Sequence, residues 1–299
     1  MNISRGLCPE QCAYCVANNR GINPRDFRTM QIDHIINQLH VYQASGVESV
    51  FLGENHFLDM AFMTELIGGI IREDLSMTFE FETHPAFFAN SGLLRKTIAA
   101  GFHRFTMGCE SGSDALLKRM GRRANRRQMM DSVKKIAKAG GLVVSSWICN
   151  LPCETESDFR ATHEMLQHVG DVGGFTYWIE NLHVLPGSRL HRNPKQWKID
   201  ILLNKLSDWV RWSLVSKTYV DPEDAARRPR DYLTHVNHGR TPGEMIRRLY
   251  TQRRLARDLV PAMKTNLAGR APHLPSELAR TERQKLDWYE EKGWKLLLF

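Results

Sequence analysis

The strongest constraint on the fold is an alternation of short, β-branched, apolar runs with amphipathic stretches along the first two thirds of the chain. Expected strands occupy residues 2–7, 47–53, 77–83, 104–110, 142–149 and 175–182. Expected helices, in which apolar residues recur with a period of about 3.6, occupy residues 32–44, 62–71, 93–100, 115–120, 129–139 and 158–169. Six alternations indicate parallel β/α units. A full barrel has eight such units, so the pattern leaves an open sheet and a partial barrel as alternatives.

The last third of the chain differs in both pattern and charge. Residues 195–299 hold 21 Lys/Arg and 13 Asp/Glu, whereas residues 1–194 hold 20 of each, so the later segment carries the whole net charge of +8. We expect helices at residues 197–220 and 243–263, separated by a polar loop at 221–239. This break divides the chain into an α/β domain, residues 1–194, and a basic, mainly helical extension, residues 195–299. A solvated helical face accounts for the surplus better than a nucleic-acid contact.

Three closely spaced cysteines follow the first expected strand. Cys8, Cys12 and Cys15 form the pattern C-x3-C-x2-C, and thiolates on so short a loop can converge on a soft metal or a cluster. Structural zinc sites and iron–sulfur clusters normally take four protein ligands. Three ligands on a four-iron cluster would leave one iron open, and a substrate or cofactor can use an open metal position. The other cysteines are distant in sequence: Cys109, Cys149 and Cys153.

The segment CPEQCAYC at residues 8–15 resembles the cluster motif of the radical S-adenosylmethionine (SAM) superfamily. The resemblance implies that Cys8, Cys12 and Cys15 hold a 4Fe–4S cluster whose open iron chelates SAM. One electron then cleaves SAM to methionine and a 5′-deoxyadenosyl radical, which abstracts hydrogen from a substrate. Tyr14 would cover the adenine. The implied fold is a partial (β/α)6 TIM-like barrel with a helical C-terminal extension, and its active site lies at the carboxyl ends of the strands.

Two further strand ends carry family-like residues. Leu52-Gly53-Glu54-Asn55 resembles the GGE-type motif that binds the methionine amino group, with Leu52 in the place of one glycine. This resemblance implies cofactor contacts at Gly53 and Glu54, although an ordinary strand-end turn is the alternative. Glu82 ends the third expected strand and resembles carboxylates that contact the cofactor in some family members.

The segment at residues 107–111, followed by LLKRMGR at 116–122, resembles the GxES…LKxMxR pattern of one large branch of the family. The resemblance implies that Glu110 and Ser111 contact the cofactor ribose. Arg122 would pair with the cofactor carboxylate, because a guanidinium is a planar fork that matches a carboxylate. Cys109 lies inside the strand, so we expect it to be a small buried apolar residue.

ICNLPCET at residues 148–155 resembles the I-x-G-L-P-G-E-T turn of the family, and the resemblance implies that Ile148 packs on the adenine. Asn150 and Cys153 replace the two usual glycines. Asn tolerates a positive φ better than most residues, whereas Cys does not, so we expect a reshaped turn. An alternative is that Cys153 faces the substrate.

The branch that this chain resembles often carries an N-terminal cobalamin-binding domain. The chain begins at the first expected strand and has no Asp-x-His-x-x-Gly signature, so cobalamin is a possible further cofactor without a binding domain in this chain. We expect a radical SAM enzyme that methylates, cyclises or oxidises a small-molecule, tetrapyrrole or natural-product substrate. A flavodoxin or ferredoxin would donate the electron. The alternatives are a degenerate non-catalytic partner protein and a simple iron–sulfur module; only the basic extension favours a nucleic-acid substrate.

Composition bounds these expectations. Hydrophobic residues make up 42% and charged residues 25% of the chain, which is typical of a globular protein and excludes disorder as its main state. No apolar run reaches the roughly 18 residues that a membrane span needs. The N-terminus lacks the apolar core of a signal peptide, so we expect a cytoplasmic protein.

Overall fold

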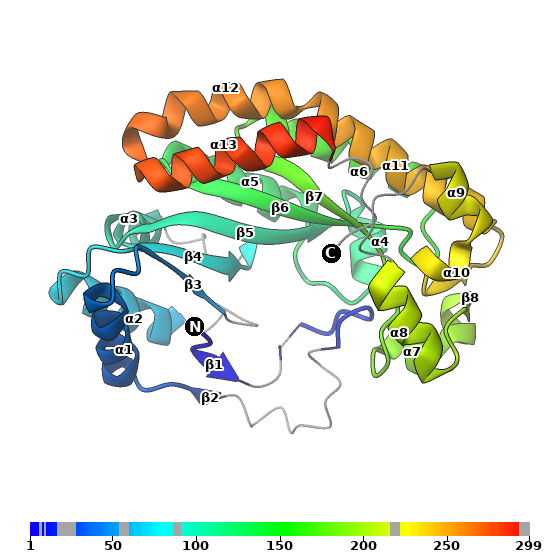
Figure 1. Ribbon diagram of the computed structural model, residues 1–299, viewed down its shortest axis with the longest axis horizontal. Coiled ribbons are helices and arrows are strands. Elements are labelled where there is room, and N and C mark those ends of the chain that lie inside the picture. The colour runs from blue at the N-terminus through cyan, green and yellow to red at the C-terminus, as the bar shows by residue number, and fades with distance from the viewer. Residues whose placement is uncertain are drawn as a thin grey trace.

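The computed structural model describes residues 1–5, 8, 10–16, 28–53, 60–85, 91–215 and 222–292. Its centre is a parallel five-stranded sheet in the order β3-β4-β5-β6-β7 (Figure 1). The strands are β3 (Ser49–Leu52), β4 (Thr78–Thr83), β5 (Phe102–Glu110), β6 (Leu142–Cys149) and β7 (Phe175–Asn181). At the β3 edge, a parallel bridge between Asn2 and Gly53 places the N-terminal segment where a sixth strand of the barrel would lie. This arrangement confirms the partial barrel.

The first expected strand is shorter than its sequence pattern. β1 (Ser4–Arg5) leaves the parallel sheet and pairs antiparallel with β2 (Arg28–Thr29). Only the residues before β1 accompany β3, where the Ile3 amide donates to the Gly53 carbonyl at 3.2 Å. The other five strands agree with the expected ranges to within two residues.

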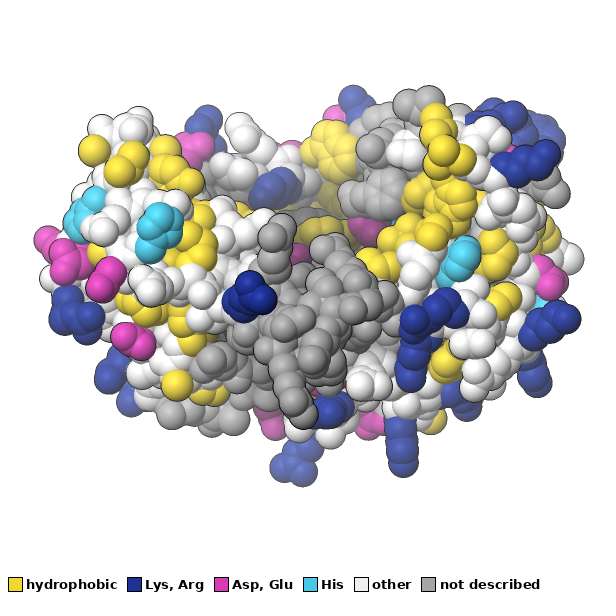
Figure 2. Space-filling view, turned by 90° about the horizontal axis from the view of Figure 1, so that it is seen from below, with side chains coloured by type: hydrophobic (Ala, Val, Ile, Leu, Met, Phe, Trp, Pro, Cys, Tyr) yellow, Lys and Arg dark blue, Asp and Glu magenta, His cyan; other side chains and the backbone are white. Residues whose placement is uncertain are grey.

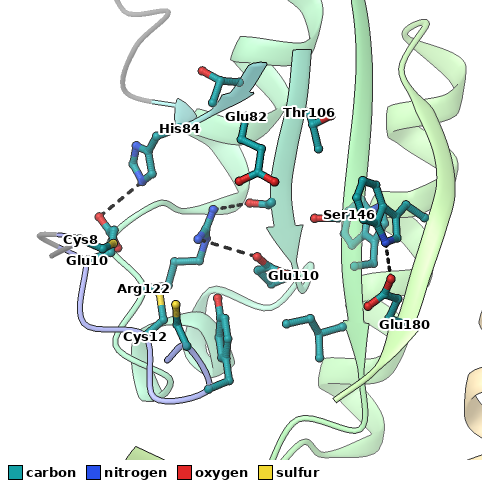
Figure 3. A pocket seen from close by; sticks show the side chains of 17 residues that line it. Cys8, Glu10, Cys12, Glu82, His84, Thr106, Glu110, Arg122, Ser146 and Glu180 are labelled. Atoms are coloured by element: carbon teal, nitrogen blue, oxygen red, sulfur yellow. Dashed lines mark hydrogen bonds and ion pairs between the residues drawn. The ribbon is translucent and has the colours of Figure 1, made fainter. Parts of the chain in front are cut away.

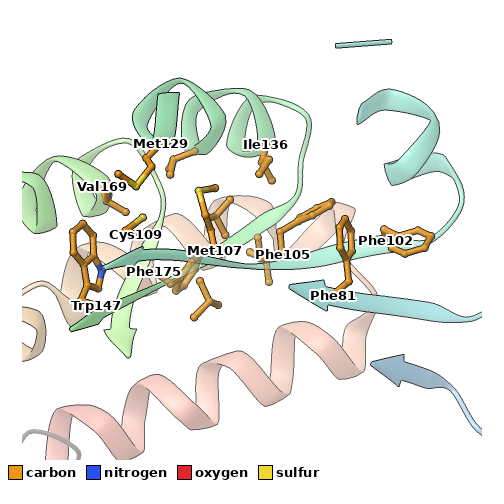
Figure 4. Close-up of a cluster of buried hydrophobic side chains, with 14 of the residues drawn as sticks. Phe81, Phe102, Phe105, Met107, Cys109, Met129, Ile136, Trp147, Val169 and Phe175 are labelled. Carbon is orange, nitrogen blue, oxygen red and sulfur yellow. The ribbon is translucent and has the colours of Figure 1, made fainter. Parts of the chain in front are cut away.

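In the part of the chain that the structure describes, six helices lie between the strands, as the sequence predicts: α1 (Ile32–Ala44), α2 (Met60–Arg72), α3 (Ser91–Ala99), α4 (Asp114–Arg119), α5 (Arg126–Lys138) and α6 (Glu156–Asp171). Their apolar stripes bury the outer face of the sheet. Met129 and Ile136 of α5 belong to the same core cluster as Met107 and Cys109 of β5 (Figure 4). Cys109 is fully buried, as expected for a small core residue.

After β7 the chain forms a series of short elements and three long helices. They are α7 (Arg189–Arg192), η3 (Pro194–Trp197), β8 (Ile199–Ile201), α8 (Leu206–Val215), α9 (Pro222–Arg227), α10 (Pro229–Tyr232), β9 (His235–Asn237), α11 (Pro242–Asp258), α12 (Val260–Arg270), η4 (Ala271–His273) and α13 (Ser276–Glu291). Within the described ranges, no helix combines the length and the apolar composition that a bilayer crossing requires.

The expected boundaries in this segment were wrong for identifiable reasons. A helix over residues 197–220 is prevented because Lys198 adopts a left-handed backbone with φ 52° and β8 pairs with β9, which lies in the expected loop. The Asp208 carboxylate then accepts the Lys205 amide at 3.0 Å, where α8 begins. The expected helix at 243–263 is two helices, because Pro261 has no amide proton to donate to the Arg257 carbonyl.

Several arginines of the C-terminal segment bond to the barrel. Arg253 of α11 is 4% exposed and donates to the Ile179 carbonyl of β7 at 2.9 Å. Arg270 of α12 donates to the Gly141 carbonyl at 3.2 Å. The expected solvated basic face was therefore wrong for these side chains. Buried residues before and after residue 194 belong to one hydrophobic cluster, so the two segments share a core.

A buried ion-pair network fixes α13 on the face of the sheet opposite α5, where the helix is drawn in pale red in Figure 4. Arg104 of β5 is 5% exposed. It forms ion pairs with Glu80 of β4 and, at 3.0 Å, with Glu282 of α13. Glu282 also accepts a hydrogen bond from Lys285 at 2.6 Å. Because Glu80 and Arg104 lie in the amino-terminal halves of their strands, α13 covers that end and leaves the carboxyl end for a cavity.

We expect Glu282→Gln to lower the free energy of unfolding by about 3 kcal/mol, since it leaves a buried guanidinium without one of its two counter-charges. Urea denaturation followed by circular dichroism measures the change. The matched control is Glu277→Gln on the same helix, whose partner Arg280 is exposed, and it should cost less than about 0.5 kcal/mol. Equal losses in the two variants would show that the network does not anchor α13.

Candidate active site at the carboxyl ends of the strands

A cavity of about 350 Å³ opens at the carboxyl ends of the strands (Figure 3). Successive side chains of a strand point to opposite faces, so alternate residues Thr106, Gly108 and Glu110 of β5 face the cavity together. The described residues that line it are Cys8, Glu10, Cys12, Tyr14, Cys15, Glu82, Thr83, His84, Thr106, Gly108, Glu110, Arg122, Ser146, Trp147, Ile148, Trp178 and Glu180.

The three cysteines of the motif all line this cavity and all are free thiols. Burial raises the pKa of Cys8 to about 12, and repulsion from Cys15 and Cys12 adds to the rise. Burial likewise raises the pKa of Cys12. Three thiols in one cavity ionise together only when a cationic centre balances them, so the donor set fits a metal centre.

The cavity brings the three thiols of the motif together, but not at the spacing of a single-ion site. Among the described residues, no three His, Cys, Asp or Glu side chains are close enough to hold one metal ion. In a tetrahedral zinc site with bonds of about 2.3 Å, the ligand sulfurs lie roughly 3.8 Å apart. A four-iron cluster is larger and takes cysteines that are farther apart, so three cysteines around one cavity are compatible with it.

The cysteine loop is held by the turn that follows α4. The Ala13 amide donates to the Met120 carbonyl at 2.7 Å, and Arg189 donates to the Gln11 carbonyl at 2.8 Å. Gly121 has φ 79°, and a Cβ there would lie 2.4 Å from the Gln11 carbonyl oxygen. The glycine in LLKRMGR therefore permits the close approach of the cysteine loop, a role that the sequence analysis missed.

Glu10, inside the cysteine motif, is a second anchor. Its carboxylate accepts the Arg123 amide at 2.9 Å and lies 3.4 Å from the His84 ring. Burial alone would raise the pKa of Glu10, but the bonds from His84 and Arg123 lower it to about 2. Glu10 could not be predicted from the sequence, because a glutamate between two cysteines has no periodic signal.

Arg122 crosses from the α4–α5 turn to β5. Its guanidinium donates to the Gly108 carbonyl and lies 4.0 Å from the Glu110 carboxylate. A Cβ at Gly108 would lie 2.5 Å from the Glu110 carboxylate oxygen, so glycine leaves room for this pair. Burial raises the pKa of Glu110 to about 7; Arg122 opposes this rise, whereas the carboxylates of Glu180 and Glu82 reinforce it.

β7 contributes two residues that the sequence analysis did not select. Trp178 and Glu180 are two positions apart, so they share one face of the strand and both line the cavity. The Trp178 indole N–H donates to the Glu180 carboxylate, and burial raises the pKa of Glu180. A carboxylate two positions after an aromatic residue, near a strand's carboxyl end, was the available signal.

The structure brings most of the predicted site residues together. Those that line the cavity are Cys8, Cys12, Cys15, Tyr14, Glu82, Glu110, Arg122 and Ile148. Gly53 lies outside the lining and bridges the N-terminal segment. Ser111 is fully buried and bonds to Thr162 at 3.0 Å, so it supports the turn after β5 and does not reach the cavity. Glu54 lies outside the described residues.

The turn after β6 keeps the backbone that glycines usually provide. Asn150 has φ 65° and Cys153 has φ 59°, so the expectation of a reshaped turn was wrong. The Asn150 amide donates to Asn181 and to the Met245 carbonyl, both at 2.8 Å. The Cys153 thiol donates to the Trp197 carbonyl at 3.7 Å and is not part of the cavity lining.

Comparison with known proteins establishes the family. The model of the Radical SAM superfamily matches residues 2–166, which is more than half of the 299 residues. The chain therefore belongs to the radical SAM superfamily, a family of enzymes that use a 4Fe–4S cluster and SAM. This match confirms the family and the cofactors predicted from the cysteine motif.

Curated relatives include two tRNA-2-methylthio-N(6)-dimethylallyladenosine synthases. The Thermus thermophilus protein is 24% identical over 228 residues, which cover 71% of this chain and 47% of the relative. The Desulfitobacterium hafniense protein is 27% identical over 223 residues, which cover 70% and 48%. The chain spans about half the length of these relatives.

Solved structures share the fold at low identity. TsrM from Kitasatospora setae, a radical SAM methyltransferase with cobalamin and a 4Fe–4S cluster bound, has a TM-score of 0.58 at 15% identity, covering 69% of this chain and 42% of TsrM. OxsB, a cobalamin-dependent radical SAM enzyme, has a TM-score of 0.59 at 12% identity, covering 87% and 46%.

The pKa of Glu110 predicts a pH dependence of folding. Its folded pKa of about 7 lies above the ordinary value of 4.5, so the folded chain binds the extra proton between these values. Stability from this group is complete below pH 4.5 and is lost as the pH rises through 7, by about 3 kcal/mol at most. Urea unfolding of the metal-free chain from pH 5 to 8 should show this decline, and Glu110→Gln should remove it. A decline of the same size in the variant contradicts the assignment.

The turn after β6 predicts opposite effects at its two unusual positions. Cys153→Gly should leave stability unchanged or raise it by up to about 1 kcal/mol, because it relieves a left-handed non-glycine residue. Asn150→Gly should lower it by about 2 kcal/mol, because it removes two buried hydrogen bonds. Thermal unfolding of both variants checks the contrast, and a destabilised Cys153→Gly would show that the thiol contact outweighs the backbone relief.

Proposed function

We propose that the chain binds a 4Fe–4S cluster through Cys8, Cys12 and Cys15, cleaves SAM reductively and modifies an organic substrate by radical chemistry. The observation that carries the proposal is that eight of the predicted cluster and cofactor residues line one cavity. When bound, the cluster supplies the electron that converts SAM to methionine and a 5′-deoxyadenosyl radical. The intact cysteine set and the left-handed turn after β6 favour this function over that of a non-catalytic partner.

The side chains of the cavity have distinct proposed tasks toward SAM. Arg122 is the candidate partner for the cofactor carboxylate, since its guanidinium is 9% exposed and already fixed by Gly108. Glu110 would accept the ribose hydroxyls, and Tyr14 and Ile148 would lie against the adenine. Their apolar surfaces exclude water, which is needed where a reactive radical forms.

The remaining predicted contacts are proposals for the rim of the site. Gly53 and Glu54 would bind the methionine amino group, and Glu82 would contribute a cofactor contact. Ser111 would act indirectly, by holding the turn that follows Glu110. A flavodoxin or ferredoxin is the proposed electron donor, and cobalamin is a proposed further cofactor by likeness to TsrM and OxsB.

The second candidate function is modification of tRNA, which the names of the curated relatives favour. It requires a surface that follows the phosphate backbone. Lys and Arg side chains on the described part of the face in Figure 2 are scattered, some near its middle and others along its margins, and do not form a continuous stripe. A small organic substrate is therefore the first candidate.

Formation of 5′-deoxyadenosine tests the proposal. We expect the chain, reconstituted anaerobically with iron and sulfide and reduced with dithionite, to form 5′-deoxyadenosine and methionine from SAM, as measured by liquid chromatography and mass spectrometry. Cys12→Ala should reduce the rate at least 100-fold because it removes a cluster ligand. Cys153→Ala is the matched control and should retain the wild-type rate. Absence of product from a chain with a verified cluster would overturn the function.

A further inference from the structure

Among the described residues, the cavity is lined by more carboxylates than basic side chains. It is lined by four carboxylates and two basic side chains: Glu10, Glu82, Glu110, Glu180, His84 and Arg122. Glu10 pairs with His84 at 3.4 Å, and Glu110 pairs with Arg122 at 4.0 Å. In the described part of the chain, neither Glu82 nor Glu180 has a cationic side chain within 4.0 Å.

The cofactors do not remove this surplus. SAM carries a sulfonium, an ammonium and a carboxylate, and so contributes one net positive charge. A 2+ four-iron cluster with three thiolates contributes one net negative charge. The two contributions cancel, so the unpaired carboxylates remain. Even if Glu82 serves SAM, Glu180 keeps only the attraction of the buried Arg253 guanidinium, which forms no ion pair with it in the described part of the chain.

Glu180 and Trp178 lie side by side in the cavity lining. The indole N–H orients the carboxylate, and the Trp178 side chain is 37% exposed. An aromatic face next to a carboxylate is a common site for an organic cation, because the ring quadrupole and the charge attract the same group. Figure 2 shows acidic side chains at the bottom of the hollow between the two flanks of the molecule.

A second, independent polar group faces the same cavity. Thr106 is 6% exposed and lines the cavity (Figure 3), and its hydroxyl has no hydrogen-bond partner among the described residues. It lies directly opposite Glu82 in the pairing of β4 and β5. The Thr106 hydroxyl can therefore donate to or accept from a group bound in the cavity.

We propose that the substrate carries a protonated nitrogen, which binds between Glu180 and Trp178 with Thr106 as a hydrogen-bonding group. The inference rests on the proposed function, since it names the substrate class of that same cavity. An ammonium supplies a positive charge at ion-pair distance and N–H donors to both carboxylates, in addition to the indole N–H that Glu180 already accepts. A polyanion such as an RNA backbone is disfavoured at this position because it would add negative charge.

Binding of a small cation tests the inference without any turnover. The probe is benzylammonium chloride and its neutral match is benzyl alcohol, each titrated calorimetrically into the cluster-loaded, SAM-bound chain without reductant. We expect benzylammonium to bind about tenfold or more tightly than benzyl alcohol. Glu180→Gln should abolish that preference. Trp178→Leu should weaken benzylammonium binding about fivefold, whereas Trp178→Phe should retain most of it.

The controls separate the possible failures. Glu164→Gln removes an exposed carboxylate on α6 and should leave the preference unchanged. Equal binding of the two probes, or a preference that survives in Glu180→Gln, overturns the inference; if that variant does not fold, Trp178→Leu and the wild-type preference decide. SAM cleavage without a cation preference rejects only the inference. A cation preference in a chain that cannot cleave SAM rejects the proposed function.

Discussion

The site depends on keeping one buried guanidinium charged. Burial alone would lower the pKa of Arg122, but Tyr14, Glu110 and Cys12 lie close enough to raise it. A buried cation is stable only where such partners surround it. Arg122 therefore ties three parts of the chain to one point: the cysteine loop, the carboxyl end of β5 and the turn after α4. This arrangement explains the glycines at 108 and 121. Gly108 leaves room for the Glu110 carboxylate beside Arg122, and Gly121 leaves room for the cysteine loop at Gln11.

A second buried arginine determines at which end of the barrel the cavity forms. Arg104 links β4 and β5 to α13, which covers the amino-terminal half of the sheet. A partial barrel of six positions has an open side, and its interior would fill with water at both ends. Because α13 covers the amino-terminal end of the sheet, polar side chains at alternate strand positions can form a cavity only at the carboxyl end. This is the end where the cysteine loop arrives.

The sequence predicted the parallel core well because its signal is local. Strand and helix periodicity depend on which side of each element is buried, and β6 was predicted with its observed ends. β8 and β9 were not predicted because each has three residues and is stable only when paired with the other. The break at Pro261 was missed although proline is a local signal, because the apolar pattern continues across it.

The candidate site was predictable where the family motifs reach and not beyond them. The three cysteines, Glu110 and Arg122 lie in motif segments, whereas Glu180 and Thr106 lie in strands whose only signal is alternation. Ser111 is the opposite case, since it occupies a motif position but its side chain bonds to Thr162 and is absent from the described lining of the cavity. A motif identifies the residues that bind a shared cofactor. The residues that distinguish one substrate from another lie outside such motifs. They can be identified only once the structure shows which side chains face the same side of the sheet.

Net charge illustrates why location matters more than composition. The net charge of +8 is carried by residues 195–299. Several arginines of this segment form hydrogen bonds or ion pairs with the barrel. Arg248 pairs with Glu154 at 3.0 Å and lies 3.7 Å from the centre of the Phe159 ring. These contacts replace water around the guanidinium with a carboxylate and an aromatic face, and so hold α11 against α6. The cavity, by contrast, is acidic. A basic chain can therefore favour a cationic substrate. Its isoelectric point reflects all the charged side chains of the chain, whereas the substrate contacts only those that line the cavity.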